Sequence, residues 1–279
     1  MMFRTRTVLL WLLGPLCGCL AFGTNIGPDS FGYTASNTSQ TFHFIEIAGT
    51  GTQILANDDE SSVFSNIGFT FNFYGTPYNG LFVNSNGLIT FGTPYNGISS
   101  QPISLATEAP SGNMPMIAVL WDDWTTFKSD APNSDAVYTE TLGSPGSRLF
   151  VVEWHNTYPF FPPGNTGLTF EVVLMEGSDN ILMQYKNVVG GTGLQSLPGY
   201  GGDNGSSAGV GIRDTSGQSN GRNVQWSFDP DTAVISNGEA ILFGTPEPST
   251  LSLLVLGALV LIPLRRRIGQ GFPARVGRD

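Results

Sequence analysis

The chain has 279 residues, of which 22 are acidic, 12 are basic and 36 are glycine, and its formal net charge at pH 7 is −10. The two ends, residues 1–23 and 246–279, contain seven of the basic residues but only two of the acidic ones. The body between them therefore carries a charge of about −15. Such a body repels a phosphate backbone, so we expect no nucleic-acid partner.

Residues 1–23 have the pattern of a secretory signal peptide. Arg4 and Arg6 form a positively charged start, residues 8–20 are apolar, and Ala21 or Gly23 supplies a small residue for cleavage. We therefore expect a signal helix here and an exported protein.

Both cysteines of the chain, Cys17 and Cys19, fall within this signal segment. A mature body without thiols cannot form a disulfide or a cysteine metal site, so its stability must come from a packed core. Residues 16–19 also resemble a lipoprotein box with Cys19 as the lipidated residue, which is an alternative to the ordinary secretory signal.

The body, residues 24–245, repeats its apolar residues with a period of two. Ile67, Phe69, Phe71 and Phe73 alternate with smaller or polar residues, which is typical of a strand with one buried face. Further apolar runs indicate strands at residues 81–83, 88–91, 116–120, 149–154, 168–175, 181–189, 208–212, 224–228 and 240–243. We expect an all-β fold, namely an antiparallel β-sandwich of Greek-key or jelly-roll-like type.

Two turns and one short echo stand out among these strands. Asn84-Ser85-Asn86-Gly87 and the acidic loop at residues 176–180 each separate two apolar runs, which predicts hairpins. The hexapeptide Gly-Thr-Pro-Tyr-Asn-Gly occurs at residues 75–80 and again at 92–97. Six residues do not make a repeat architecture, and two similar turns at one end of a sheet would account for them.

Several ordered blocks of the body resemble the nidogen-like extracellular pattern. These blocks are residues 71–75, 83–91, 117–123, 150–154, 169–174 and 181–185. The resemblance spans roughly residues 62–215 and rests mainly on turn and core residues, which specify a fold rather than a reaction. It implies a domain of the kind found in matrix and adhesion proteins, with no catalytic residues attached to it.

Acidic loops make calcium the candidate cofactor. Asp58-Asp59-Glu60, Asp122-Asp123 and Asp203-Asn204 offer the oxygen ligands that a hard cation prefers, although none has the spacing of a known calcium loop. We select Asp122 and Asp123 as the candidate site, because they follow a strand in the most recognisable block. Solvated carboxylates on an acidic surface are the simpler interpretation.

Glu153 and His155 form the other candidate site, for contact with a glycan. Alternation along a strand places both on one face and Trp154 on the other. In the simpler interpretation, Trp154 is a core residue and His155 is a solvated residue at the strand end.

Motifs for catalysis are missing from the sequence. It contains no zinc-binding helix motif, phosphate-binding loop or dinucleotide fingerprint. Residues 205–209 fit the nucleophile-elbow spacing, but a strand-like run follows them where a helix is needed. We therefore expect a protein that is not an enzyme.

The C-terminal segment, residues 246–279, combines three features in order. Pro246-Glu247-Pro248 precedes an apolar run at residues 251–264, and Arg265-Arg266-Arg267 follow it. As a helix the run would be about 21 Å long, which is short against a hydrocarbon core of about 30 Å. The arginines favour the cytoplasmic side, so the body would lie outside. An ordinary tail anchor or a buried helix is the alternative.

This arrangement resembles the PEP-CTERM sorting tail of Gram-negative bacteria. The resemblance implies an exosortase-like processing enzyme as a partner, transient anchoring in the inner membrane through a helix at residues 251–264, and delivery to the cell surface. The chain departs from the family pattern by continuing from residue 268 to 279.

Together these features predict an exported protein with a structural or adhesive role at the cell surface or in the exopolysaccharide matrix. Two alternatives come from other classes. One is a carbohydrate-binding module with exposed aromatic residues, and the other is a secreted glycan-active enzyme with two carboxylates in a cleft.

Overall fold

The computed structural model describes residues 23–38, 40–96, 104–105, 114–126, 136–159, 167–188, 208–215, 220–227 and 235–245. Every regular element in these ranges is a strand, and all strand pairs are antiparallel, which confirms the predicted all-β class. The described residues include no helix with the length and apolar character that a membrane span requires. The helices expected at residues 1–23 and 251–264 lie outside the described part of the chain.

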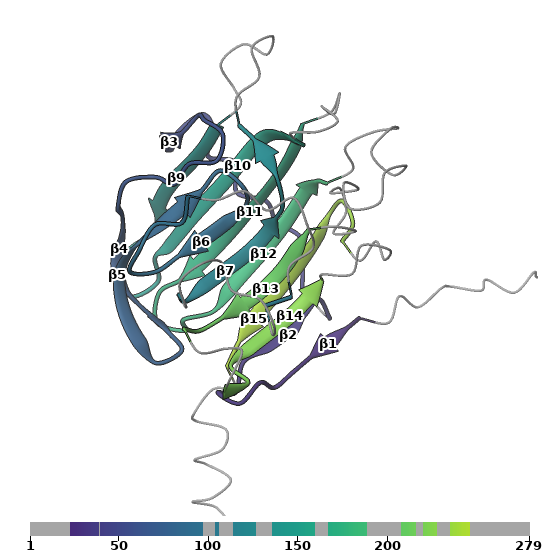
Figure 1. Ribbon diagram of the computed structural model, residues 1–279. Coiled ribbons are helices and arrows are strands. Elements are labelled where there is room, and N and C mark those ends of the chain that lie inside the picture. Colours follow the sequence, from purple (N-terminus) through teal and green to yellow (C-terminus); the bar gives the residue numbers. More distant parts are fainter. Residues whose placement is uncertain are drawn as a thin grey trace, which may run out of the picture.

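The strands form two sheets, which lie one over the other in Figure 1. The larger sheet runs in the order β1 (Asn25–Ile26), β2 (Thr34–Ser36), β15 (Glu239–Gly244), β12 (Ile181–Asn187), β11 (Leu168–Met175), β10 (Leu149–Pro159), β9 (Ala136–Leu142) and β3 (Thr52–Leu55), with β8 (Trp124–Thr125) paired to β10. The smaller sheet runs in the order β14 (Asn223–Ser227), β13 (Gly209–Arg213), β7 (Met116–Trp121), β6 (Leu88–Thr90), β5 (Thr76–Asn84) and β4 (Ser65–Phe73).

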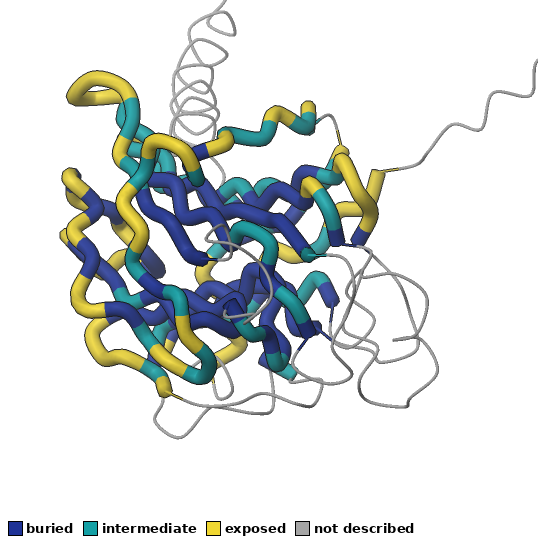
Figure 2. The backbone as a smooth tube through the Cα atoms, turned by 90° about the horizontal axis from the view of Figure 1, so that it is seen from above, coloured by how far each residue is buried: buried dark blue, intermediate teal, exposed yellow. Residues whose placement is uncertain are grey.

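The main core lies between the two sheets. Phe71 and Val119 of the smaller sheet and Trp154 of the larger sheet belong to one cluster of buried side chains. Two hydrogen bonds cross this core: the Tyr185 hydroxyl donates to the Val119 carbonyl at 2.8 Å, and the Trp154 indole donates to the Asn84 carbonyl at 3.0 Å. Figure 2 shows the buried backbone concentrated in two layers.

Burial along the strands follows the apolar pattern of the sequence. In β4 buried and exposed residues alternate strictly, as the period of two predicts. In β7 every residue is buried, because Ile117 and Val119 face the main core while Met116 and Ala118 belong to a second cluster on the opposite face.

Both predicted hairpins are present. The turn at residues 84–87 joins β5 to β6, and residues 176–180 join β11 to β12. Gly87 has a φ of 78°, and a Cβ on it would lie 2.2 Å from the carbonyl oxygen of Leu120. Only glycine fits this conformation and this close approach.

The exposed edge of β4 is capped by side chains from β9 and from the β9–β10 and β11–β12 turns of the larger sheet. Thr141 Oγ1 donates to the carbonyl of Ile67 at 2.9 Å, and Arg148 donates to that of Gly68. The backbone N–H of Asn72 donates to Asp179 Oδ1 at 2.9 Å. These bonds occupy groups that a further strand would need, so they protect the edge from pairing with another chain.

Candidate functional site

Three carboxylates from two distant loops meet at one end of the structure. Asp58 and Asp59 follow β3, and Asp123 lies between β7 and β8. A β-bridge between Asp58 and Thr125 of β8 holds the two loops together. One carboxylate oxygen from each of the three aspartates lies within 4.8 Å of the others. We call this group the acidic cluster.

Asn86 positions the acidic cluster from the hairpin turn of the smaller sheet. Its Nδ2 donates to Asp59 Oδ1 at 2.9 Å, and its Oδ1 accepts the backbone N–H of Trp124 at 3.0 Å. Because Asn86 is fully buried, it fixes the loop of Asp59 against the loop of Asp123. Asp59 has a φ of 52°, a conformation that aspartate tolerates better than most residues.

The electrostatics of the cluster favour a bound positive charge. Burial, together with the charges of Asp59, Asp58 and Asp122, raises the pKa of Asp123 to about 7. Burial and the charge of Asp59 also raise the pKa of Asp58. Asp58 Oδ1 and Asp123 Oδ1 are buried and accept no hydrogen bond. A hard cation such as Ca²⁺ would supply the charge and the partner that these oxygens lack.

Asp122 has a different position from Asp123. Its side chain is 5% exposed, and its Oδ1 accepts the backbone N–H of Asp123 at 2.7 Å. It contributes to the electrostatics of the cluster but is not one of the three converging ligands. The structure thus joins two of the acidic loops noted in the sequence, whereas residues 203–204 lie outside the described part.

The other candidate pair, Glu153 and His155, lies on the outer face of β10. Glu153 Oε1 is 2.7 Å from His155 Nδ1, as expected for residues on the same face of a strand. Trp154 points the other way and stacks on Phe170 in the core, with 5.2 Å between ring centroids. Glu153 is fully buried, whereas the His155 side chain is 18% exposed. His155 is therefore the member of the pair that reaches the surface.

Residues 40–48 cross this outer face and explain the burial of Glu153. We call this segment the strap. The backbone N–H groups of residues 43, 45 and 47 donate to Gln184, Glu171 and Glu153, at 2.6, 3.1 and 2.7 Å. These three side chains are neighbours across β12, β11 and β10. Glu153 also accepts the N–H of Ala48, so its carboxylate anchors the strap.

Glu171 of β11 lies in the middle of the row beneath the strap. Its Oε1 accepts hydrogen bonds from Ile45 and from Gln184 Nε2, whereas its Oε2 is buried without a partner. Burial raises the pKa of Glu171 to about 8, so the group is largely protonated at neutral pH. Sequence reasoning missed Glu171 and Gln184, although polar residues inside strongly apolar strands were a usable signal.

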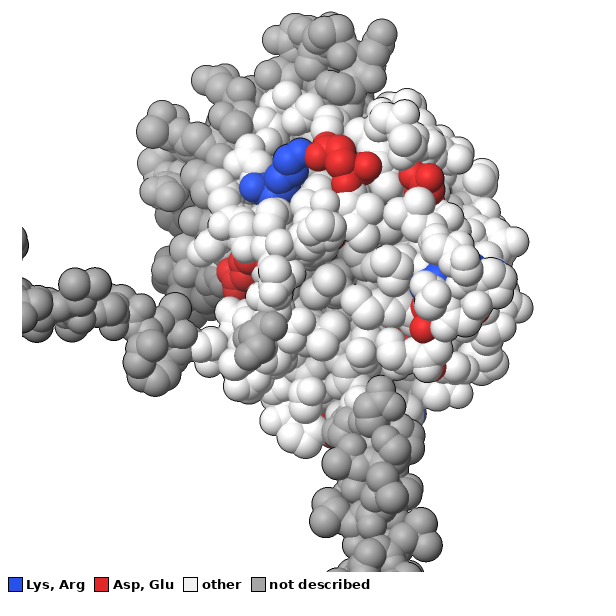
Figure 3. Space-filling model, turned by 180° about the vertical axis from the view of Figure 1, so that it is seen from behind, with Lys and Arg blue, Asp and Glu red and all other residues white. Residues whose placement is uncertain are grey.

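Glu46 of the strap completes a second group of titratable residues. Carboxylate oxygens of Glu46 and Glu153 and a ring nitrogen of His155 lie within 4.8 Å of one another. Glu46 is 3.5 Å from His155 Nδ1 and also pairs with Lys186. Figure 3 shows a face that is largely uncharged, with small separate groups of acidic and basic side chains.

The residues of the predicted sorting tail follow the last strand in the sequence. Pro246, Glu247, Pro248, Arg265, Arg266 and Arg267 lie outside the described residues, as does the apolar run between them. Thr245 is the last described residue, one position after the end of β15.

Two antiparallel sheets around one core define an all-β domain rather than a helical or mixed one. The chain belongs to the nidogen-related family, whose model, described as NIDO related, matches residues 32–245. This confirms the nidogen-like resemblance and extends it to the whole of β2 through β15. A search of curated proteins and a search of solved structures found no match.

Proposed function

We propose that the protein is an exported structural or adhesive component of the cell surface or of the exopolysaccharide matrix, with a β-sandwich body. The observation that carries this proposal is where the body ends. The family match ends at residue 245 and β15 ends at Gly244, immediately before Pro246-Glu247-Pro248. In the sequence, the Pro-Glu-Pro motif therefore follows directly on the matched domain, which is the position that a removable address requires.

The tail acts as a transient anchor in this proposal. The apolar run at residues 251–264 enters the inner membrane, and Arg265, Arg266 and Arg267 hold the cytoplasmic side. An exosortase-like enzyme then cuts at or near the Pro-Glu-Pro motif and releases the body. Because β15 pairs with β12 and β2 inside the larger sheet, cleavage after residue 245 leaves intact every strand pair in the described part of the chain.

The body suits a non-enzymatic role outside the cell. Its stability comes from a large apolar core between the sheets, without any cysteine in residues 24–245. Its capped β4 edge limits uncontrolled pairing with other sheets, which is useful for a domain present at high local concentration.

We further propose that Ca²⁺ occupies the acidic cluster of Asp58, Asp59 and Asp123. The two buried oxygens without hydrogen bonds support this proposal. The ion would tie the loop after β3 to the loop before β8, and so stabilise the body where calcium is available.

Mass spectrometry of the protein from a producing cell tests the sorting proposal. We expect the surface or extracellular fraction to contain a chain that begins near residue 22 or 24 and ends near residue 246. Replacing Pro246, Glu247 and Pro248 with alanine should leave an uncut chain in the membrane fraction. Pro273→Ala, in the extension beyond the arginines, is the control and should be processed normally. An intact chain in the cytoplasm would contradict the proposal at both ends.

A further inference from the structure

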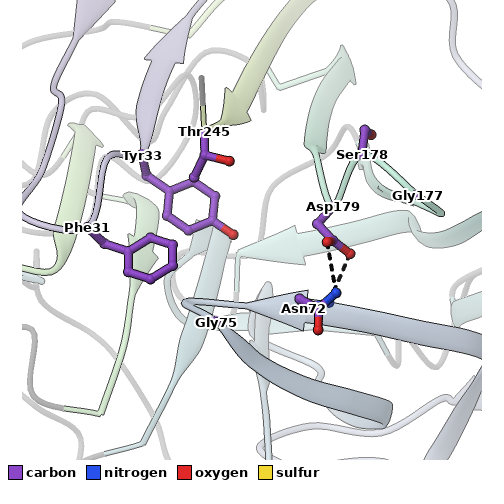
Figure 4. Close-up of a pocket in the computed structure, with 8 residues that line it drawn as sticks. All are labelled: Phe31, Tyr33, Asn72, Gly75, Gly177, Ser178, Asp179 and Thr245. Carbon is purple, nitrogen blue, oxygen red and sulfur yellow. Dashed lines mark hydrogen bonds between the residues drawn. The ribbon is translucent and has the colours of Figure 1, made fainter. Parts of the chain in front are cut away.

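A small pocket lies where loops of both sheets meet. It has a volume of about 220 Å³, and its lining comes from the loop before β2, the β4–β5 turn, the β11–β12 turn and the end of β15. Figure 4 shows its two walls, with aromatic rings on one side and a carboxylate and an amide on the other. The lining residues are Phe31, Tyr33, Asn72, Gly75, Gly177, Ser178, Asp179 and Thr245.

The aromatic wall consists of Phe31 and Tyr33. Their rings stack with 5.7 Å between centroids, and the Arg222 guanidinium lies 5.3 Å from the Phe31 ring centroid. Phe31 remains 38% exposed, whereas Tyr33 is buried. Phe31 therefore supplies most of the aromatic surface that a ligand can reach.

Asp29 holds this aromatic wall in place. Its Oδ1 accepts the backbone N–H groups of Phe31, Gly32 and Tyr33 at 3.0, 2.9 and 2.9 Å. Its Oδ2 accepts the hydroxyl of Tyr74 at 2.8 Å. Four hydrogen bonds on one carboxylate make the loop before β2 locally rigid, so a ligand would not have to order it.

The polar wall is also preorganised. Asp179 accepts the backbone N–H and the side-chain Nδ2 of Asn72, both at 2.9 Å. Each carboxylate oxygen keeps a further lone pair for a donor from a ligand. The Tyr33 hydroxyl points toward Asp179 in Figure 4, and burial raises the pKa of Tyr33, so this hydroxyl stays protonated as a donor.

Two glycines form tight turns at the pocket. Gly75 has a φ of 79° and Gly177 a φ of 85°, and both line the pocket. A Cβ on Gly75 would lie 3.4 Å from the Phe31 ring. Asn72 lies near the end of β4 and Asp179 in the β11–β12 turn, so a strand and a turn together form the polar wall.

The dimensions and charges of the pocket restrict the ligand. Pockets for drug-sized molecules have volumes of roughly 300–1,000 Å³, so this one suits a single ring. An apolar wall opposite hydrogen-bond acceptors fits a molecule with one C–H face and a rim of hydroxyl groups. The Asp179 carboxylate accepts hydroxyl hydrogen bonds but repels an acid, and Arg222 is already paired with Asp214 at 3.2 Å.

From this geometry, we infer that the pocket binds one neutral pyranose residue of an extracellular polysaccharide. The inference rests on the matrix role proposed above and gives that role a ligand class and a contact point. Thr245 places the pocket where the body joins the sorting tail, so the glycan contact would lie close to the end released by processing.

Affinity electrophoresis of the full chain in mild detergent tests the inference. The probes are dextran and a galactomannan, which are neutral, and alginate, which is acidic. We expect retardation by at least one neutral polymer, competition by free glucose or mannose, and no retardation by alginate. Failure of both neutral polymers, or binding to alginate alone, overturns the inference.

Substitutions of residues that line the pocket test whether the glycan binds there. Phe31→Ala and Asp179→Asn should each weaken binding about tenfold or more, because the first removes the exposed aromatic ring and the second replaces a charged acceptor with a neutral amide. The amide oxygen of Asp179→Asn can still accept the Asn72 N–H, so the fold should persist. Phe64→Ala is the matched control, since Phe64 is 58% exposed and lies outside the pocket.

Thermal unfolding of each variant separates loss of binding from loss of fold. If Phe31→Ala unfolds, Asp179→Asn and Ser178→Ala decide the question, and normal binding by both overturns the inference. The fractionation described above is independent of these measurements. A protein that binds glycan but is not exported would refute the matrix role and leave the pocket in place.

Discussion

Glu153 Oε1 lies 2.7 Å from His155 Nδ1 on the outer face of β10, while Oε2 of the same carboxylate accepts the backbone N–H groups of Ile47 and Ala48. One buried carboxylate therefore links a surface histidine to the strap. This arrangement gives the pair a structural role that its sequence pattern did not reveal.

Removing this carboxylate should destabilise the protein. Glu153→Ala leaves two strap N–H groups without their acceptor in a buried site, and we expect a loss of about 2–4 kcal/mol in the free energy of unfolding. Urea denaturation checks the value. Glu140→Ala is the control, because the Glu140 carboxylate accepts a hydrogen bond from the exposed Thr50 hydroxyl rather than from buried backbone N–H groups. Equal losses for the two variants would contradict the anchoring role.

Glu171 should make stability depend on pH. Its pKa is raised from 4.5 to about 8 in the folded state, so between these values the folded protein binds more protons than the unfolded chain. The free energy of unfolding should therefore fall as pH rises from about 4.5 to 8. Glu171→Gln, which resembles the protonated group, should flatten this dependence.

Asp123 contributes to stability with the same sign between pH 3.8 and about 7, so the Glu171 effect must be read as a difference between wild type and variant. Urea denaturation of the wild type and of Glu171→Gln at pH 5, 6.5 and 8 measures this difference in the free energy of unfolding. A variant that keeps the full wild-type slope would show that Glu171 is not the source.

Calcium should raise the melting temperature through the acidic cluster. At a free concentration of about 100 times the dissociation constant, a bound ion adds about 2.7 kcal/mol. Because protons compete for Asp123, the effect should be larger at pH 8 than at pH 5. Thermal scans with added Ca²⁺ or with a chelator measure it.

Neighbouring aspartates provide the matched variants for this test. Asp123→Asn should abolish the calcium response, whereas Asp122→Asn should retain most of it, since Asp122 is not one of the converging ligands. A full response in Asp123→Asn, or none in the wild type, would exclude the proposed site.

Alanine variants of two glycines with similar φ distinguish the cost of a steric clash from the cost of backbone strain. Gly87→Ala places a Cβ 2.2 Å from the Leu120 carbonyl oxygen, whereas Gly92→Ala, with a φ of 88°, meets nothing within 4 Å. We expect a loss of about 1–2 kcal/mol for Gly92→Ala from strain alone. Gly87→Ala should lose clearly more in chemical denaturation, and similar losses would mean that the turn relaxes freely.

Much of the strand pattern could be predicted from local sequence. The alternation in β4 and the Asn-Gly turn before β6 are local signals, and both were read correctly. The short strands β1, β2, β3 and β8 and the longer β9 were not predicted. Most of them have only two to four residues, too few for a period to be detected.

The candidate sites depended more on tertiary contacts. The sequence indicated acidic loops, but their meeting required the bridge between Asp58 and Thr125 and the two hydrogen bonds of Asn86. The strap depends on side chains from three separate strands, and the pocket between Phe31 and Asp179 combines segments from both sheets. A local sequence pattern does not indicate which residues far apart in the chain come into contact.

The repeated hexapeptide shows the difference between what local sequence determines and what tertiary contacts determine. Residues 75–80 and 92–97 are identical, yet the first copy enters β5 at Thr76, while residues 92–96 form no strand. The sequence by itself determined an all-β body, its hairpins and its lack of thiols, because periodicity, turn residues and composition act locally. Only the tertiary structure decided which copy pairs with β4 and which carboxylates converge, because those outcomes depend on partners far away in the chain.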